Sequence, residues 1–168
     1  MLSFSKGLEL AMIGVGGFGG VMQGGCIRIF SGQRPINANQ AIPPSTSAVL
    51  IGSVTTEGLT FYPGNNVNNA GLNFRIDESN LLSNFGQWVF TAVASGEPAW
   101  FRWVWSGADD GGLSVYYPRL DGDIGKISNV ESYSEGLYSG YDMVFRDAPV
   151  IAGERIVLSR MQMWMNYA

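Results

Sequence analysis

Short apolar and aromatic runs, each ended by glycine, proline or asparagine, constrain this chain more than any other feature. The two strongest runs are 87–92 (QWVFTA) and 99–105 (AWFRWVW). Their aromatic and β-branched side chains suit a pleated, half-buried surface. No run after Ile13 has the 3.6-residue period of an amphipathic helix. The sequence therefore predicts an all-β fold, namely a jelly-roll-like β-sandwich.

Weaker runs predict the remaining strands of this sandwich. They lie at 26–30, 48–54, 59–62, 72–76, 113–117, 125–129, 141–145 and 150–158. The stretch 33–47 contains three prolines and is expected to be a loop, because proline cannot donate to a β-ladder. The stretch 65–69 holds four asparagines and is expected to be a turn, while 77–84 is expected to form one helical turn.

The first 25 residues are predicted to form a segment of their own. A short helix over Ser5–Ile13 is followed by glycines, which predicts a flexible arm before a sandwich domain at 26–168. The apolar part is too short to cross a bilayer, so no membrane partner is expected. Residues 14–19 match the dinucleotide pattern G-x-G-x-x-G, but no helix is predicted to follow, so we do not expect nucleotide binding. The arm residues expected to dock on a neighbour are Leu8, Leu10, Met12 and Ile13.

The composition favours a protein that is covered by neighbours. Charged residues make up 14% of the 168 residues, against roughly 25% in an ordinary soluble domain. The chain also has 23 glycines and five tryptophans. Its net charge is −4 and its lysines and arginines are scattered. Nucleic-acid binding needs a concentrated basic patch, so no nucleic acid is expected as a partner.

Catalysis, metal binding and cofactor binding are not expected. The chain has no histidine, which removes the usual general base near neutral pH and the usual zinc ligand. The single cysteine, Cys26, excludes an intrachain disulfide and is predicted to be a buried, inert thiol. Asp121 and Asp123 do not continue into a calcium-loop pattern, so they are expected in a tight turn. We therefore assign no catalytic, cofactor-binding or metal-binding residue.

The run 99–105 carries one face with three possible roles. Trp100, Arg102 and Val104 point to one side of the strand, while Phe101 and Trp103 point to the other. Tryptophan and arginine are enriched at interface hot spots, so Trp100 and Arg102 are predicted to contact a neighbour. The alternatives are that loops or the amino-terminal segment cover this face internally, or that it stacks on sugars.

The last residues alternate with a period of two. Met161, Met163 and Met165 fall on one face, and Trp164 falls on the other. This pattern predicts a closing strand with the methionines in the core. Trp164 is expected to contact a neighbour.

Several short pieces of the chain resemble a family of small structural proteins of tailed bacteriophages. They occur in the same order as in that family, which begins with a short helix. The sequence departs from the pattern at Asn37 and Asn39, where acidic residues are expected, at Asp121 and Asp123, and in an extra segment over 130–140. The resembling pieces are 27–35, 37–41, 99–102, 122–125, 142–145 and 151–156.

The resemblance implies a virion component similar to capsid cement or decoration proteins. On this hypothesis the chain is made in the host cytoplasm, is not an enzyme, and binds the exterior of the assembled capsid. Its partners would be the major capsid protein of the same virion and further copies of itself, as a dimer or trimer. Two alternatives stay open: a glycan-binding module of a tail fibre or spike, and a tail or collar connector.

Overall fold

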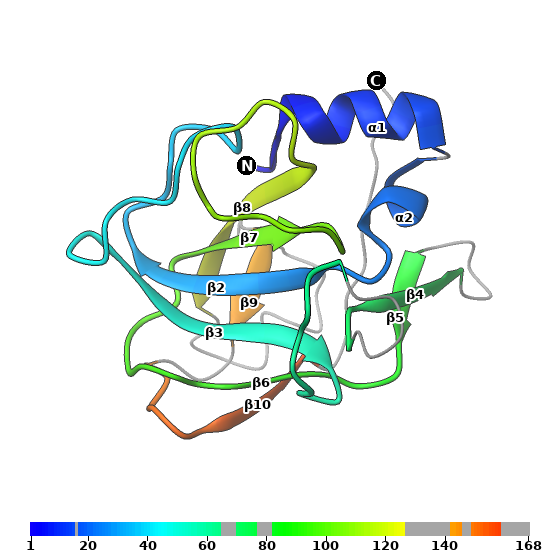
Figure 1. The fold of residues 1–168 in the computed structure, drawn as a ribbon. Helices are drawn as coiled ribbons and strands as arrows, with labels where there is room; N and C mark the ends of the chain where they lie inside the picture. The colour runs from blue at the N-terminus through cyan, green and yellow to red at the C-terminus, as the bar shows by residue number, and fades with distance from the viewer. Residues whose placement is uncertain (16, 65–69, 77–81, 127–141, 146–148, 159–168) are drawn as a thin grey trace.

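The computed structural model describes residues 1–168 except 16, 65–69, 77–81, 127–141, 146–148 and 159–168. The described part is mostly β, with an antiparallel sheet of seven strands and two helices (Figure 1). The elements are β1 (Ser3–Phe4), α1 (Lys6–Val15), α2 (Gly17–Met22), β2 (Cys26–Gly32), β3 (Ala48–Thr56), β4 (Asn73–Ile76), β5 (Leu82–Phe85), β6 (Trp88–Thr91), β7 (Trp100–Val104), β8 (Arg119–Lys126), β9 (Met143–Phe145) and β10 (Arg155–Leu158).

The strand order of the main sheet is β1-β8-β7-β2-β3-β6-β10. Strand β9 pairs with β8 in parallel, and β4 and β5 form a separate hairpin. The first strand of the chain thus lies beside one of the last. Strands β2 and β7 lie near the middle of the sheet, and β7 is one of the two strands with the strongest β-forming sequences, the other being β6.

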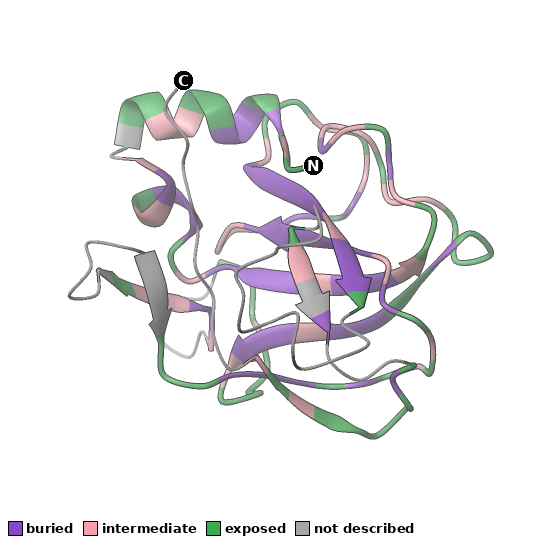
Figure 2. Cartoon of the chain, turned by 180° about the vertical axis from the view of Figure 1, so that it is seen from behind, coloured by how far each residue is buried: buried purple, intermediate pink, exposed green. Residues whose placement is uncertain are grey.

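The apolar core packs against one face of the curved sheet. Figure 2 shows that the central strands, such as β7, are buried along most of their length. Alternate residues of the strands point into it, including Ile27 and Ile29 of β2 and Trp103 of β7. The rings of Phe90 in β6 and Phe145 in β9 are 6.2 Å apart, although these strands are not neighbours in the sheet. The sheet therefore curls around its core.

The amino-terminal segment is part of this core, so the prediction of a flexible arm is wrong. Leu8 of α1 is fully buried, and α2 buries Phe18 and Met22. The ring of Phe18 packs edge-on against that of Trp103 at 5.4 Å. A glycine at position 25 allows close approach, because a Cβ there would lie 2.1 Å from the Val104 carbonyl oxygen. The glycines thus permit tight packing rather than mobility.

Other sequence expectations also need correction. The runs 59–62 and 113–117 are loops, and Leu82–Phe85 is a strand where a helical turn was expected. Asp121 and Asp123 lie inside β8 and do not form a turn. Asp121 is tolerated in a strand because a buried arginine of β7 faces it. The rest of the expected helical turn, 77–81, lies outside the described residues.

Candidate functional site

A layer of buried ion pairs covers the face of the sheet opposite the core. In this layer the Arg102 guanidinium of β7 forms a two-point ion pair with the Asp121 carboxylate of β8. The Nε–Oδ1 and Nη2–Oδ2 distances are both 2.7 Å. Arg102 also donates from Nη1 to the Gln40 carbonyl oxygen at 3.0 Å. Both side chains are fully buried. A two-point guanidinium–carboxylate contact of this kind fixes orientation as well as charge.

A second buried pair joins β8 to the loop that precedes it. Arg119 donates from Nε to Asp109 Oδ2 at 2.7 Å and from Nη2 to Oδ1 at 2.5 Å. Burial alone would raise the pKa of Asp109. The Arg119 hydrogen bonds, the Gly111 backbone N–H and the charges of Arg119 and Arg28 outweigh burial, so the pKa of Asp109 is lowered. Asp109 therefore stays ionised at neutral pH.

These pairs place two predicted contact residues inside the protein. Trp100 and Arg102 are fully buried, and the Trp100 ring stacks on Phe30 with 4.2 Å between centroids. Gln40 of the loop 33–47 covers Arg102, and the loop between β7 and β8 covers Arg119. The predicted role of Trp100 and Arg102 in contact with a neighbour is wrong, and so is the sugar-stacking alternative for this face. The internal-cover alternative is confirmed.

In the described part of the chain, the ion-pair layer holds one more cation than it holds anions. Among its described members, Arg28, Arg102 and Arg119 face two carboxylates, those of Asp109 and Asp121. The two ion pairs use both carboxylates. Arg28 instead donates from Nη2 to the Asp109 backbone carbonyl oxygen at 3.2 Å, and it is only partly buried.

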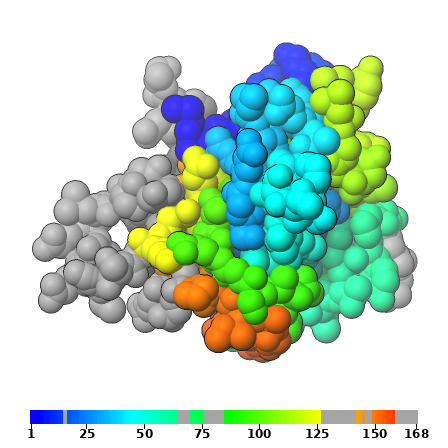
Figure 3. Space-filling model, turned by 90° about the vertical axis from the view of Figure 1, so that its left-hand side faces the viewer, coloured from blue at the N-terminus to red at the C-terminus, as the bar shows by residue number. Residues whose placement is uncertain are grey.

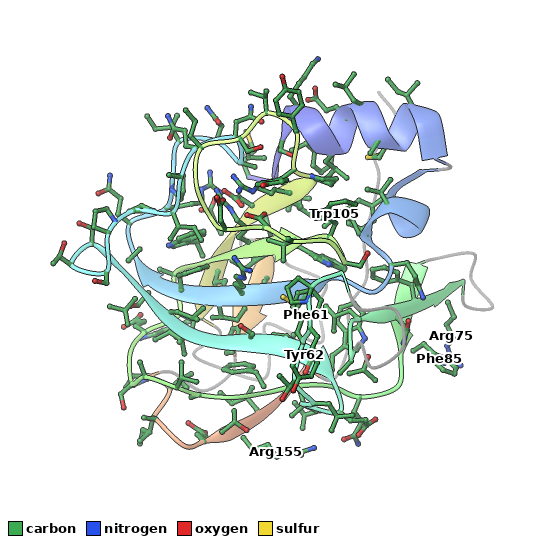
Figure 4. All side chains as sticks on the ribbon, viewed as in Figure 1. Phe61, Tyr62, Arg75, Phe85, Trp105 and Arg155 are labelled. Atoms are coloured by element: carbon green, nitrogen blue, oxygen red, sulfur yellow. The ribbon has the colours of Figure 1, made fainter. Side chains whose placement is uncertain are left out.

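Arg28 lines a cleft on the outer face of β2, β3 and β6. The cleft has a volume of about 410 Å³ and is closed on one side by the loop 58–63. Figure 4 shows Phe61 of this loop in front of β2. The loop is fixed at its base, because the Thr55 hydroxyl donates to the Leu59 carbonyl oxygen at 2.6 Å. The lining residues used below are Arg28, Leu50, Ser53, Phe61, Thr91 and Val93.

Cys26 lies at the inner end of this cleft and is not a nucleophile at neutral pH. The prediction that it is buried is confirmed. Burial raises the pKa of the thiol to about 11, and the nearby Arg28 lowers it only in part. A thiol with so high a pKa carries very little thiolate at pH 7.

Five exposed apolar side chains on three neighbouring segments are here called the α1 surface. It consists of Leu10 and Ile13 on α1, Ile36, Leu113 and Tyr116, and each of these side chains is more than half exposed. Asn39 holds the three segments together: its side chain accepts from the Lys6 N–H, and its carbonyl accepts from the Ser114 N–H. Figure 3 shows the three segments side by side.

The docking residues predicted from the sequence differ in how far they are exposed. Leu8 is fully buried, so its predicted contact with a neighbour is wrong, and Met12 is partly buried against the core. Leu10 and Ile13 are exposed, at 56% and 86%. Trp164, Met161, Met163 and Met165 lie outside the described residues.

Neither the cleft nor the buried position of Arg119 was predicted from the sequence. A signal for Arg28 was present, because an arginine in the otherwise apolar run 26–30 marks one face of the strand. No sequence pattern shows that the loop 58–63 would fold over that face.

Two further observations concern the described residues only. They contain no group of three or more His, Cys, Asp or Glu side chains placed to hold a metal ion. None of their helices has the length and apolarity needed to span a membrane.

Comparisons of the chain with protein-family models, curated proteins and solved structures gave no match.

Proposed function

We propose that the chain is a non-enzymatic structural protein of a phage virion that binds the exterior of the assembled capsid and stabilises it. The observation that carries this proposal is the α1 surface. Its five apolar side chains are exposed on segments that hydrogen bonds hold together. Exposed apolar side chains gathered on one surface mark sites of protein interaction. The low charged fraction of 14% supports the same conclusion.

Binding would stabilise the capsid by burying area across the junctions between its subunits. A standard interface buries roughly 1,600 Å² in total, about half of it on each partner. Many copies repeat the contact, and a dimer or trimer of this chain gains further from avidity. The partner in this proposal is the major capsid protein of the same virion.

The jelly-roll-like sandwich stays part of the proposal. One contact across the core supports it, the Phe90–Phe145 ring contact. This contact brings together β6 and β9, which are far apart along the strand order. An experimental structure that covers 127–141 and 159–168 would test whether a second sheet closes the sandwich.

Point substitutions on the α1 surface test the function. Deleting residues 1–25 would remove Leu8, Phe18 and Met22 from the core, so it cannot isolate a surface effect. In the double variant Leu10→Asp/Ile13→Asp we expect capsid occupancy at least tenfold lower than for wild type. Ile151→Asp is the matched control, because Ile151 is an exposed apolar residue just before β10 in the chain. Figure 1 shows α1 and β10 at opposite ends of the molecule. Equal occupancy of all three proteins would overturn the proposal.

A reconstruction of the particle separates the proposal from a tail or collar connector. We expect density for the chain on the capsid exterior, in hundreds of copies. A connector would instead be present in about a dozen copies or fewer at one vertex, because its ring symmetry limits its number. The glycan-binding alternative loses the Trp100 face that motivated it, since that face is buried.

A further inference from the structure

We propose that the cleft over Arg28 binds an acidic saccharide, with Arg28 holding its carboxylate. The first reason is the charge of the ion-pair layer. Two carboxylates are each bound by their own arginine, whereas Arg28 donates to the Asp109 backbone carbonyl oxygen at 3.2 Å and shares the Asp109 charge with Arg119. A guanidinium that is partly withdrawn from water and forms no ion pair with a described carboxylate attracts an anion, and its planar fork fits a carboxylate.

The second reason is the set of groups around Arg28. Ser53 lies opposite Arg28 in the register of β2 and β3, and Thr91 lines the same cleft from β6. Both residues carry hydroxyls, which can donate to and accept from the hydroxyls of a sugar. Phe61 stands at one side of this polar strip, and aromatic side chains pack well on the apolar face of a sugar ring.

The shape of the cleft favours a saccharide over an inorganic anion or a peptide. A volume of about 410 Å³ lies within the usual range for a small organic ligand and far exceeds that of a bare anion. Extended peptides bind at free sheet edges through their backbone. Strands β2, β3 and β6 each have a strand partner on both sides, so the floor of the cleft offers no such edge.

The proposal does not depend on the α1 surface, because no residue of that surface lines the cleft. Failure of capsid binding and failure of saccharide binding are therefore separate results. In a calorimetric or NMR titration of the full chain with glucuronate, we expect a dissociation constant of about 1 mM or tighter. Glucose, which lacks the carboxylate, should bind at least tenfold more weakly. Acetate and sulfate should also bind at least tenfold more weakly, because they use only the Arg28 end of the cleft.

Three variants locate the binding. Arg28→Gln removes the cation and should weaken glucuronate binding at least tenfold. Thr91→Glu places a negative charge in the cleft at an exposed position, so it should have the same effect without disturbing the core. Arg75→Gln is the control, because Arg75 is an exposed arginine on the separate β4–β5 hairpin and does not line the cleft (Figure 4). It should bind glucuronate as wild type does.

Several results would overturn the proposal. One is the absence of glucuronate binding, and another is equal affinity for glucuronate and glucose. Equal affinity for acetate or sulfate would reduce the cleft to a simple anion site. Tighter binding of an acidic peptide than of an oligomer of glucuronate would assign the cleft to a protein partner. Unchanged binding by Thr91→Glu, in a variant with wild-type thermal stability, would place the ligand elsewhere.

Discussion

The Arg102 guanidinium and the Asp121 carboxylate face each other across β7 and β8 through two hydrogen bonds of 2.7 Å, and water reaches neither side chain. The pair lies between the sheet and the loop 33–47, whose Gln40 carbonyl accepts a third hydrogen bond from Arg102. The stability of both the sheet and the loop that covers it should therefore depend on this ion pair.

Removing one charge of this pair should be strongly destabilising. In Asp121→Asn, Arg102 stays buried without a counter-charge, so we expect the free energy of unfolding to fall by about 3 to 5 kcal/mol. Urea unfolding followed by tryptophan fluorescence measures it. Glu9→Gln is the control, because it breaks the exposed Lys6–Glu9 pair at 3.4 Å and should change little. Equal effects of the two substitutions would contradict the importance of burial.

Asp109 should make the protein sensitive to acid. Its folded pKa lies below the ordinary value of 3.8, so the unfolded state binds its proton first as the pH falls. The stabilisation is present above the ordinary pKa and is lost as the pH falls through the folded one. We expect the stability difference between wild type and Asp109→Asn to shrink from about pH 5 to about pH 2. A difference that stays constant over this range would contradict the assignment.

Cys26 should make the stability of the protein depend on pH in the alkaline range. Its thiol has a pKa of about 11 in the folded protein, against 9.0 for an ordinary thiol. The unfolded state therefore loses its proton first, and stability falls as the pH rises through this interval, by up to about 1.4 kcal/mol per pH unit. The gap between wild type and Cys26→Ala should narrow accordingly in urea unfolding. At pH 8, a thiol reagent should label Cys26 only after unfolding, and rapid labelling of the folded protein would show that the thiol is accessible.

Replacing two glycines of α1 by alanine should change the free energy of unfolding in opposite directions. A Cβ at Gly7 would lie 2.3 Å from the Tyr116 carbonyl oxygen, whereas a Cβ at Gly14 would meet nothing within 4 Å. Gly7→Ala should lower the free energy of unfolding by about 1 to 3 kcal/mol, because the helix must move off the loop. Gly14→Ala should raise it by about 0.5 to 1 kcal/mol through helix propensity. Thermal unfolding of the two variants measures both, and a neutral Gly7→Ala would show that the contact is loose.

The sequence alone predicted the strands whose residues carry their own signal. The runs that became β2, β6 and β7 are apolar and aromatic, and their ends differ from the prediction by only a few residues. The prediction failed where the partner decides the structure. Glycine-rich α2 is helical because its Phe18 and Met22 side chains pack in the core. Strand β8 tolerates Asp121 because Arg102 lies opposite it in β7.

The candidate sites could be predicted only in part, for the same reason. Alternation correctly placed Trp100 and Arg102 on one face of β7, but it could not show that the loop 33–47 covers that face. Likewise, the helical pattern of α1 identified Leu10 and Ile13 but did not separate them from buried Leu8. Which residues stay exposed depends on contacts between segments that are distant in the sequence.

The position of β1 beside β8 has a consequence for synthesis in the cell. Ser3 and Phe4 pair with Asp121 and Leu120, so β1 can pair only after a strand that is synthesised more than a hundred residues later. Until then Leu8 and the apolar side of α1 have no sheet edge to pack beside. Folding of such a topology is slow, and the apolar side of α1 is prone to aggregation while it stays exposed. Yield from a fast expression system should therefore improve when translation is slowed or a chaperone shields the nascent chain.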